Sequence, residues 1–266
     1  MSIKSLIQTA LAPSGLELHR RPDPTLPLLN QFETDGQTHR LWLTNPFTKS
    51  WWHKPTIPLN GELSELKRLC RNGSTVLEVG AHHGLMTILM AGWVGDHGHV
   101  HAVEASADNA LVLDANCFQN RLQNVTTSFT AIGSHAGTVS FGGESLAAAS
   151  GIVREVPMVM ADQLCSEQGI SKVDVLKIDV EGYEMGVLQG AANLLLQKPK
   201  LALELHVDLL REAGSSAAAV WRFLDEHNML SNRPISMLAR PDWDDVKQIT
   251  EFEQIPAEGV VNLFVG

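Results

Sequence analysis

The chain has 266 residues, 44% of them apolar and 19% charged, and its formal net charge is −10 at pH 7. This length supports a full-sized hydrophobic core, and the composition excludes wholesale disorder. The acidic balance argues against a nucleic-acid partner, because neutralising phosphate groups requires a surplus of Lys and Arg.

The cysteines and the apolar segments set the expected compartment. The three cysteines form no C-x-x-C pair, which indicates neither a disulfide framework nor a zinc site. No apolar run reaches the length of about 18 residues that a membrane-spanning helix needs, and the N-terminus lacks a signal-peptide pattern. We therefore expect a cytoplasmic protein with no membrane partner.

The first sixty residues differ from the rest because prolines interrupt regular structure repeatedly. A short helix is predicted over residues 1–11. A β-hairpin is predicted over residues 32–42, where apolar and polar residues alternate around an Asp35-Gly36 turn.

An aromatic cluster of Trp51, Trp52 and His53 follows the hairpin. It either packs as a lid on the core or forms one wall of a substrate pocket, since Trp and His combine apolar area with a polar tip. We expect residues 1–60 to form an N-terminal extension or substrate lid and residues 61–266 to form the main domain.

From a helix predicted over residues 62–71 onward, strands and helices alternate. Strands are predicted over residues 76–79, 99–104, 125–131, 173–179 and 201–206. Helices are predicted over residues 85–93, 108–118, 161–167, 184–196 and 215–226. This alternation predicts a Rossmann-like, doubly wound α/β fold, in which right-handed crossovers join mostly parallel strands.

Two departures from the alternation complete the prediction. A short extra strand is predicted over residues 138–141, before a loop rich in Gly, Ala and Ser over residues 142–150. Strands over residues 235–238 and 260–265 flank an acidic, irregular segment and are predicted to pair as a hairpin-like unit at the sheet edge. The result is a seven-stranded sheet with an antiparallel edge strand.

The segment VLEVGAHHG, residues 76–84, is typical of a buried strand that runs into a glycine-opened turn. Gly80 and Gly84 let the backbone turn tightly and approach a ligand where a Cβ would collide. The dinucleotide fingerprint G-x-G-x-x-G is absent, because residues 81–83 contain no glycine. The segment predicts a nucleotide-binding loop and leaves an NAD-dependent oxidoreductase as an alternative.

Charged residues end the neighbouring strands, at the edge where open parallel sheets bind ligands. Glu104 ends the second strand of the alternation, where one carboxylate accepts hydrogen bonds from both hydroxyls of a ribose. In KIDVEGYE, Lys177 and Asp179 point to one side of an apolar strand, and in LELH, Glu204 and His206 share a face. Burying such charges costs several kcal/mol unless they are paired or bound to a ligand.

Each of these features also has a purely structural interpretation. Glu104 would then be a solvated charge at a strand end. Lys177 would neutralise Asp179, while Glu181 would cap the following helix. His206 would be an imidazole that is only hydrogen-bonded at a strand end.

The ordered motifs resemble those of the FkbM family within the class I S-adenosylmethionine-dependent methyltransferases. The motifs that carry the resemblance are VLEVGAHHG, GHVHAVEASADNALVLDAN, NVTTSFTAIGSHAGTVSF, VPMVMADQL, VDVLKIDVEGYEMGVLQGA and LALELH, which cover residues 76–206. Members of the family commonly have Asp at the place of Glu78 and Asn at that of His82.

The resemblance implies S-adenosylmethionine as the cofactor. The residues that it implies for cofactor binding are Glu78, Gly80, Ala81, His82, Gly84, Glu104, Ala105, Ser106, Ile132 and Asp179. Within this set, Gly80 and Ala81 would shape the methionine pocket, Glu104 would hold the ribose and Ile132 would border the adenine.

We expect methyl transfer to a hydroxyl group of a sugar, a glycan or a small natural product, with His206, Asp179 and Glu204 as catalytic residues. Either His206 acts as general base, or Asp179 and Glu204, with His206, hold Mg²⁺ or Mn²⁺ that acidifies the hydroxyl. A degenerate, non-catalytic binding module remains an alternative. An edge hairpin and an apolar N-terminal region are compatible with a homodimer.

Overall fold

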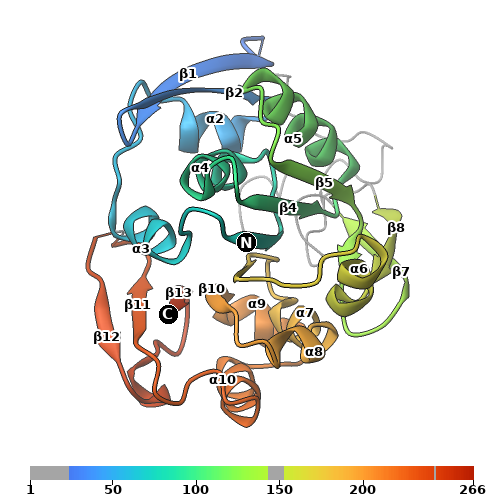
Figure 1. Ribbon diagram of the computed structural model, residues 1–266, viewed down its shortest axis with the longest axis vertical. Helices are drawn as coiled ribbons and strands as arrows, with labels where there is room; N and C mark the ends of the chain where they lie inside the picture. The colour runs from blue at the N-terminus through green and yellow to red at the C-terminus, as the bar shows by residue number, and fades with distance from the viewer. Residues whose placement is uncertain (1–23, 143–152, 243) are drawn as a thin grey trace, which may run out of the picture.

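A computed structural model describes residues 24–142, 153–242 and 244–266 of the chain (Figure 1). The helix predicted over residues 1–11 lies outside the described residues, and so does the loop predicted over residues 142–150, apart from its first residue. Within the described ranges, no helix is both long and apolar enough to cross a lipid bilayer.

The main sheet has eight strands in the order β12-β11-β13-β10-β9-β3-β4-β5. In chain order they are β3 (Thr75–Val79), β4 (His99–Glu104), β5 (Val125–Phe129), β9 (Val175–Ile178), β10 (Lys200–His206), β11 (Ile235–Ala239), β12 (Lys247–Ile249) and β13 (Val260–Val265). β3, β4, β5, β9 and β10 are parallel, whereas β13, β11 and β12 pair antiparallel with their neighbours. The strand order reverses between β3 and β9, which is where open α/β sheets bind ligands.

Two layers of helices cover the sheet (Figure 1). On one face lie α3 (Gly61–Leu69), α4 (Leu85–Val94) and α5 (Ala107–Gln119); on the other lie α6 (Ala161–Glu167), α7 (Glu184–Gly190), α8 (Ala192–Leu195), α9 (Val207–Glu212) and α10 (Ala217–Glu226). β3, β9 and β10 are buried on both faces, as their nearly continuous apolar sequences predict. The doubly wound, Rossmann-like fold is confirmed.

The N-terminal hairpin consists of β1 (Leu28–Thr34) and β2 (Gln37–Leu43), which pair antiparallel. Asp35 and Gly36 form its turn with φ of 52° and 74°, as a type I′ turn requires. The hairpin packs on α4 through an apolar cluster that includes Phe32 and Ile88. A short helix, α2 (Pro46–Trp52), follows it and begins at the side chain of Asn45.

The hairpin is not part of the main sheet, and two side-chain amides hold β2 in place: Asn116 of α5 and Asn120, which directly follows α5. Oδ1 of Asn116 accepts from the backbone N–H of Trp42 at 2.6 Å, and its Nδ2 donates to the carbonyl of His83 at 2.7 Å. One turn later, Asn120 exchanges two hydrogen bonds with the backbone of Arg40.

The structure differs from the prediction in the antiparallel part of the sheet. The sheet has eight strands rather than seven, because the segment expected to be irregular contributes β12 at the edge. β13 does not lie at the edge but is inserted between β10 and β11. Its buried apolar sequence on both sides explains this interior position.

Other differences concern element boundaries. The strand predicted over residues 125–131 ends at Phe129, and the chain then enters a separate three-stranded sheet in the order β6-β8-β7. Its strands are β6 (Ala131–Ile132), β7 (Gly137–Gly142) and β8 (Val153–Val159), of which only β7 matches a predicted extra strand. The helix predicted over residues 184–196 is broken at Ala191 into α7 and α8. The helices α2 and α9 were not predicted, nor was the short 3₁₀ helix Phe252–Gln254.

Candidate active site

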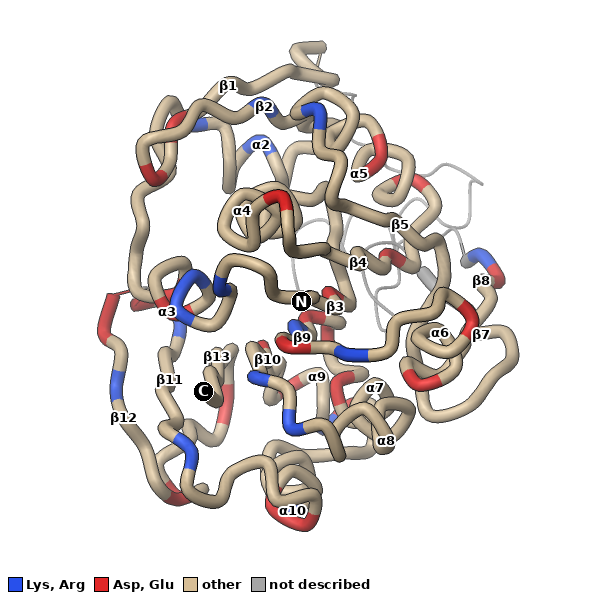
Figure 2. Tube along the Cα trace, viewed as in Figure 1, with Lys and Arg blue, Asp and Glu red and all other residues tan. Residues whose placement is uncertain are grey.

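A cavity of about 510 Å³ opens at the carboxyl ends of β3, β4, β9 and β10, beside the reversal of strand order. This volume lies within the range of small-molecule pockets, about 300–1,000 Å³. Residues of α2 and α3, from the N-terminal part of the chain, also line the cavity. Charged residues gather around β3, β9 and β10 (Figure 2), and six acidic and three basic side chains line the cavity.

The loop after β3 brings backbone to the floor of the cavity. Gly80 has φ of +87°, and a Cβ on it would lie 1.8 Å from the carbonyl oxygen of Asp179. The backbone N–H groups of Gly80 and Ala81 both donate to the carbonyl of Val103, which fixes the loop against β4. Gly84 has φ of +86° and precedes α4, and a Cβ there would lie 2.5 Å from Leu113. Glycine is therefore required at both positions.

Glu104 lies at the end of β4 and is buried, with its carboxylate held in one orientation. Its Oε2 accepts from the backbone N–H of His82 and its Oε1 from that of Ser106, both at 2.7 Å. Burial raises the pKa of this carboxyl to about 7, against the opposing effect of the hydrogen bonds. Since each carboxylate oxygen accepts more than one hydrogen bond, Glu104 retains capacity for a pair of ligand hydroxyls.

A buried ion cluster connects β3 and β9. Nζ of Lys177 lies 3.5 Å from Oε1 of Glu78 and 3.5 Å from Oδ2 of Asp179. Burial disfavours the charge on Lys177, but Asp179 and Glu78 outweigh it and raise the pKa. Glu78 also accepts from the hydroxyl of Thr87 at 2.6 Å. The structural interpretation in which Lys177 neutralises Asp179 therefore agrees with this geometry.

The other structural interpretation, a Glu181 cap on the following helix, is wrong. α7 begins after Tyr183, which provides no side-chain cap. The carboxylate that accepts from the preceding loop, at the backbone N–H of Gly182, belongs to Glu184.

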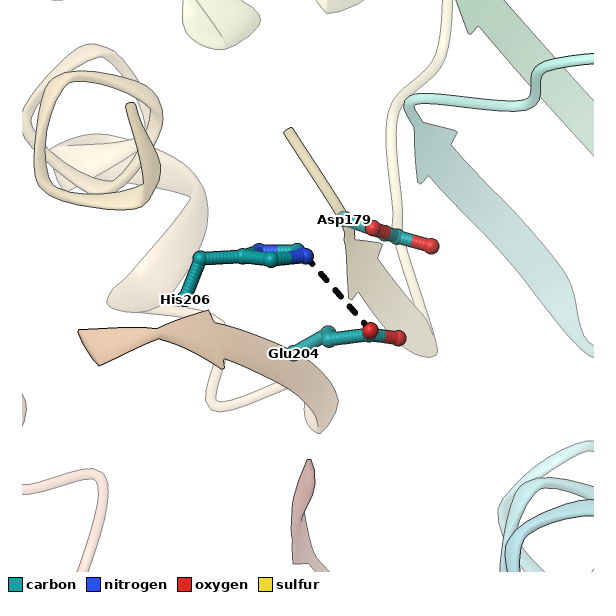
Figure 3. A group of neighbouring side chains, drawn as sticks. All are labelled: Asp179, Glu204 and His206. Carbon is teal, nitrogen blue, oxygen red and sulfur yellow. Dashed lines mark ion pairs between the residues drawn. The ribbon is translucent and has the colours of Figure 1, made fainter. Parts of the chain in front are cut away.

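Asp179, Glu204 and His206 point toward one another (Figure 3) and place one ligand atom each within 4.8 Å of the others. Nε2 of His206 lies 3.6 Å from Oε1 of Glu204, too far for a hydrogen bond. Nδ1 of the same ring lies 2.9 Å from Oε1 of the fully buried Glu184. Glu204 also accepts from Nη2 of Arg240 at 2.5 Å.

The electrostatics of this cluster depend on its acids. Burial and the charge of Asp179 raise the pKa of Glu204 to about 8. Burial alone would lower the pKa of His206, but the hydrogen bond to Glu184 and the charge of Asp179 raise it to about 9. Without a bound ion, His206 is therefore an imidazolium at neutral pH.

The donor set also suits a divalent cation. Two carboxylates and an imidazole are common ligands, and ligands of one ion lie about 3–4 Å apart, close to the 3.6 Å between Glu204 and His206. The Glu184 carboxylate would fix the ring orientation, as second carboxylates do for histidine ligands of metals. Asp179 and Glu204 line the cavity, whereas His206 is not among its described lining residues.

Aromatic side chains form the wall opposite the sheet. Trp51 and Trp52 line the cavity, and the ring of Trp52 packs edge-on at 5.4 Å from that of His82. His82 stacks on His83 at 4.5 Å, and neither of its ring nitrogens has a hydrogen-bond partner among the described residues. Burial lowers the pKa of His82 to about 4, so its ring is neutral. Trp51 and Trp52 thus both line the cavity and pack against neighbouring rings, whereas His53 is not among the described lining residues.

Most of the predicted site residues meet at this cavity. Those that line it are Glu78, Gly80, Ala81, His82, Glu104, Ala105, Ile132, Asp179 and Glu204, whereas Gly84, Ser106 and His206 lie next to it. Sequence reasoning missed Glu62 and Arg240, which also line the cavity, and the buried partner Glu184. Of these three residues, only Glu184 could have been noticed in the sequence, because it is a charged residue within the KIDVEGYE motif.

The reversed strand order, the glycine-opened loop and the acid at the end of β4 define a Rossmann-like protein with a site for a nucleoside-containing cofactor. The model of the Methyltransferase FkbM domain matches residues 78–230, more than half of the chain. The chain therefore belongs to the FkbM family, and it is an S-adenosylmethionine-dependent methyltransferase.

Solved structures of low sequence identity resemble the chain only loosely. A putative rRNA methylase from Clostridium thermocellum is 12% identical over 77% of this chain and 95% of its own, with a TM-score of 0.47. A SAM-dependent methyltransferase from Aquifex aeolicus is 14% identical over 83% and 93%, with a TM-score of 0.46. A SAM-dependent O-methyltransferase from Thermotoga maritima is 13% identical over 89% and 76%, with a TM-score of 0.44. No curated protein matches the sequence.

Proposed function

We propose that this methyltransferase acts on oxygen, at a hydroxyl group of a sugar, a glycan or a small natural product. The observation that carries the proposal is that Asp179 and Glu204 line the same cavity as the Gly80 loop and Glu104. A hydroxyl nucleophile must lose its proton, and these acids provide charged groups where the acceptor would meet the methyl donor.

The cofactor fits the geometry of the loop and of the second strand. Gly80 and Ala81 would hold the methionine part against their backbone, and Gly80 also packs on the backbone of Asp179, where a Cβ has no room. Glu104 would accept from the ribose hydroxyls, beside Ala105 and Ser106, and Ile132 would border the adenine. When bound, S-adenosylmethionine supplies an activated methyl group on sulfur. The chain's contribution is alignment of the acceptor oxygen, which is worth roughly 7–11 kcal/mol in well-oriented reactions.

Proton removal has two candidate routes. In the first, His206 is the general base; its pKa of about 9 requires it to lose a proton before it can accept one. In the second, Asp179, Glu204 and His206 hold Mg²⁺ or Mn²⁺, which lowers the pKa of the acceptor hydroxyl. The 2.9 Å bond between Glu184 and Nδ1, which directs Nε2 toward the carboxylates, suits both routes.

We expect the reaction to take place in the cytoplasm, on a small-molecule or glycan acceptor and with no nucleic-acid or membrane partner. We also expect the chain to form a homodimer. The acidic net charge supports the exclusion of nucleic acid. Size-exclusion chromatography with light scattering checks the dimer.

Calorimetry and radiolabel transfer test the proposed function. We expect the chain to bind S-adenosylhomocysteine and not NAD, and to transfer labelled methyl from S-adenosylmethionine to sugars or hydroxylated natural products. Transfer to amines or thiols alone would contradict O-methylation. Cofactor binding without transfer to any acceptor would support the degenerate binding module, whereas product formation that is lost in Asp179→Ala or His206→Ala would exclude it.

A further inference from the structure

Glu62 is a buried carboxylate in the cavity wall that the site described above leaves unused. It is only 9% exposed and lines the cavity together with Lys177, Asp179, Glu204 and Arg240. Among the residues that the structure describes, none forms a hydrogen bond or an ion pair with its carboxylate. Its oxygens are not among the enclosed side-chain atoms that lack a partner, so they reach the open space of the cavity, where an ionised carboxylate can accept hydrogen bonds from a bound molecule.

Helix stability does not explain this position. An acid in the first turn of a helix interacts favourably with the helix dipole, but this interaction is worth at most about 2 kcal/mol, less than the several kcal/mol that burying an unpaired carboxylate costs. The capping of α3 is already complete, because Oδ1 of Asn60 accepts from the backbone N–H of Leu63 at 2.9 Å. Glu65, one turn later on the same helix, forms an ion pair with Arg68. Glu62 instead faces the cavity.

The charges around Glu62 indicate what kind of donor it meets. Six acidic side chains and three basic ones line the cavity, so an anionic acceptor would be repelled. Two of the basic groups already serve acids: Lys177 lies near Glu78 and Asp179, and Arg240 bonds to Glu204. An uncharged molecule with hydroxyl groups avoids this repulsion and can donate to the Glu62 carboxylate.

The aromatic wall fits the same molecule. Trp51 is 47% exposed and, with Trp52, presents apolar ring area to the cavity. The carbon-bound hydrogens of a sugar ring pack on such rings, while its hydroxyls need acceptors at the rim. Burial raises the pKa of Glu62 to about 7, so near neutral pH its carboxyl group both donates and accepts.

We propose that Glu62 binds the acceptor, and that this acceptor is an uncharged, polyhydroxylated molecule of the sugar class whose hydroxyls donate to the Glu62 carboxylate. This inference rests on the proposed O-methyltransferase function and narrows its substrate class. It assigns to the first turn of α3 a role in specificity that is separate from cofactor binding.

The test compares Glu62→Gln with Glu65→Gln, which makes the same change one turn later on the same helix, at a side chain that is not among the described lining residues of the cavity. Binding of S-adenosylhomocysteine, measured by calorimetry, should stay within about twofold of wild type in both variants, which also shows that both fold. Saturation-transfer NMR on the S-adenosylhomocysteine complex then uses neutral methyl glycosides, sugar phosphates, uronic acids and amino sugars as probes. The wild type should prefer the neutral glycosides.

Kinetics with labelled S-adenosylmethionine complete the test. For the best glycoside, Glu62→Gln should raise KM about tenfold, the loss expected for one hydrogen bond to a charged group, with kcat little changed. Glu65→Gln should match the wild type. An unchanged KM in Glu62→Gln, or a preference for anionic or amino sugars, would overturn the inference and leave O-methylation intact. Methylation of phenols or alcohols but of no sugar would do the same, whereas no transfer to any hydroxyl would overturn the proposed function itself.

Discussion

His206 and Glu184 form a buried pair, with Nδ1 of the imidazole 2.9 Å from Oε1 of a carboxylate that solvent does not reach. The pair joins the end of β10 to the first turn of α7. It directs the other ring nitrogen toward Glu204 and Glu181, each 3.6 Å away. The orientation of the imidazole is therefore set by a residue outside the cavity.

This pair predicts how stability depends on pH. The folded pKa of His206, about 9, exceeds the ordinary value of 6.5, so its contribution is fully present below pH 6.5 and is lost as the pH rises through 9. Glu184→Gln should reduce the loss between pH 6.5 and 9. The raised pKa of Glu204 remains in the variant, so part of the loss persists. Urea unfolding at pH 6, 7.5 and 9 measures this, with the exposed Glu167→Gln as control.

Substitution of Gly80 should abolish cofactor binding. In Gly80→Ala the new Cβ meets the carbonyl of Asp179 at 1.8 Å, and the backbone is held at φ of +87°. Gly36→Ala is the matched control, because Gly36 has φ of +74° but nothing within 4 Å of its Cβ position. The control isolates the conformational strain, about 1–2 kcal/mol. Calorimetry with S-adenosylhomocysteine should show normal binding in the control only, and binding by Gly80→Ala would contradict the close approach.

Cofactor affinity should rise with pH because of Glu104. Burial raises the pKa of this carboxyl to about 7, and ribose hydroxyls donate best to the ionised form. From pH 6 to pH 8 the ionised fraction increases about tenfold, and the affinity for S-adenosylhomocysteine should follow. Glu104→Gln should bind more weakly at pH 8 and show a flat profile. A flat profile in the wild type would show that Glu104 does not contact the ribose.

Binding of Mn²⁺ discriminates the two routes of proton removal. If Asp179, Glu204 and His206 hold a metal, paramagnetic resonance should detect one bound Mn²⁺ per chain, and EDTA should remove both the signal and methyl transfer. Asp179→Asn should lose the ion, whereas the exposed Asp96→Asn should retain it. Full activity in EDTA would favour His206 as the base, with a rate that rises toward pH 9.

The amide side chains of Asn116 and Asn120 should matter unequally for stability. Asn116→Ala removes partners from Trp42 and His83 in a buried setting and should lower the free energy of unfolding by about 2–4 kcal/mol. Asn120→Ala removes a similar pair of bonds to Arg40 where water can replace them, and should cost about 1 kcal/mol or less. Equal losses would show that burial does not control this contact.

The sequence predicts the parallel half of the fold well because each strand there carries its own signal. The apolar run of β3, the Asp-Gly turn of the hairpin and the acid that ends β4 are local features. The position of β13 between β10 and β11 is different, because an antiparallel insertion depends on which strand edge is vacant after folding. Only long-range pairing decides that.

The candidate site also combines residues that local sequence features predict with residues that only tertiary packing brings to it. Glu104, Asp179 and Glu204 were predictable because strand ends converge at one edge of a parallel sheet. Glu62 and Arg240 were not, since they come from α3 and from the segment after β11 and reach the cavity only through tertiary packing. The sequence also could not predict that His206 lies outside the cavity lining. Strand periodicity tells on which face of the strand a side chain lies, but not how far that side chain extends toward the cavity.

The hydrogen bonds from Asn116 and Asn120 to β2 all go to backbone atoms. Such a contact recognises the path of the chain and not the identity of the side chains along it. Exposed residues of the hairpin can therefore change during evolution, or in a designed library, while the hairpin stays docked. The protein thus combines an attachment through backbone atoms with a hairpin surface whose side chains that attachment does not fix.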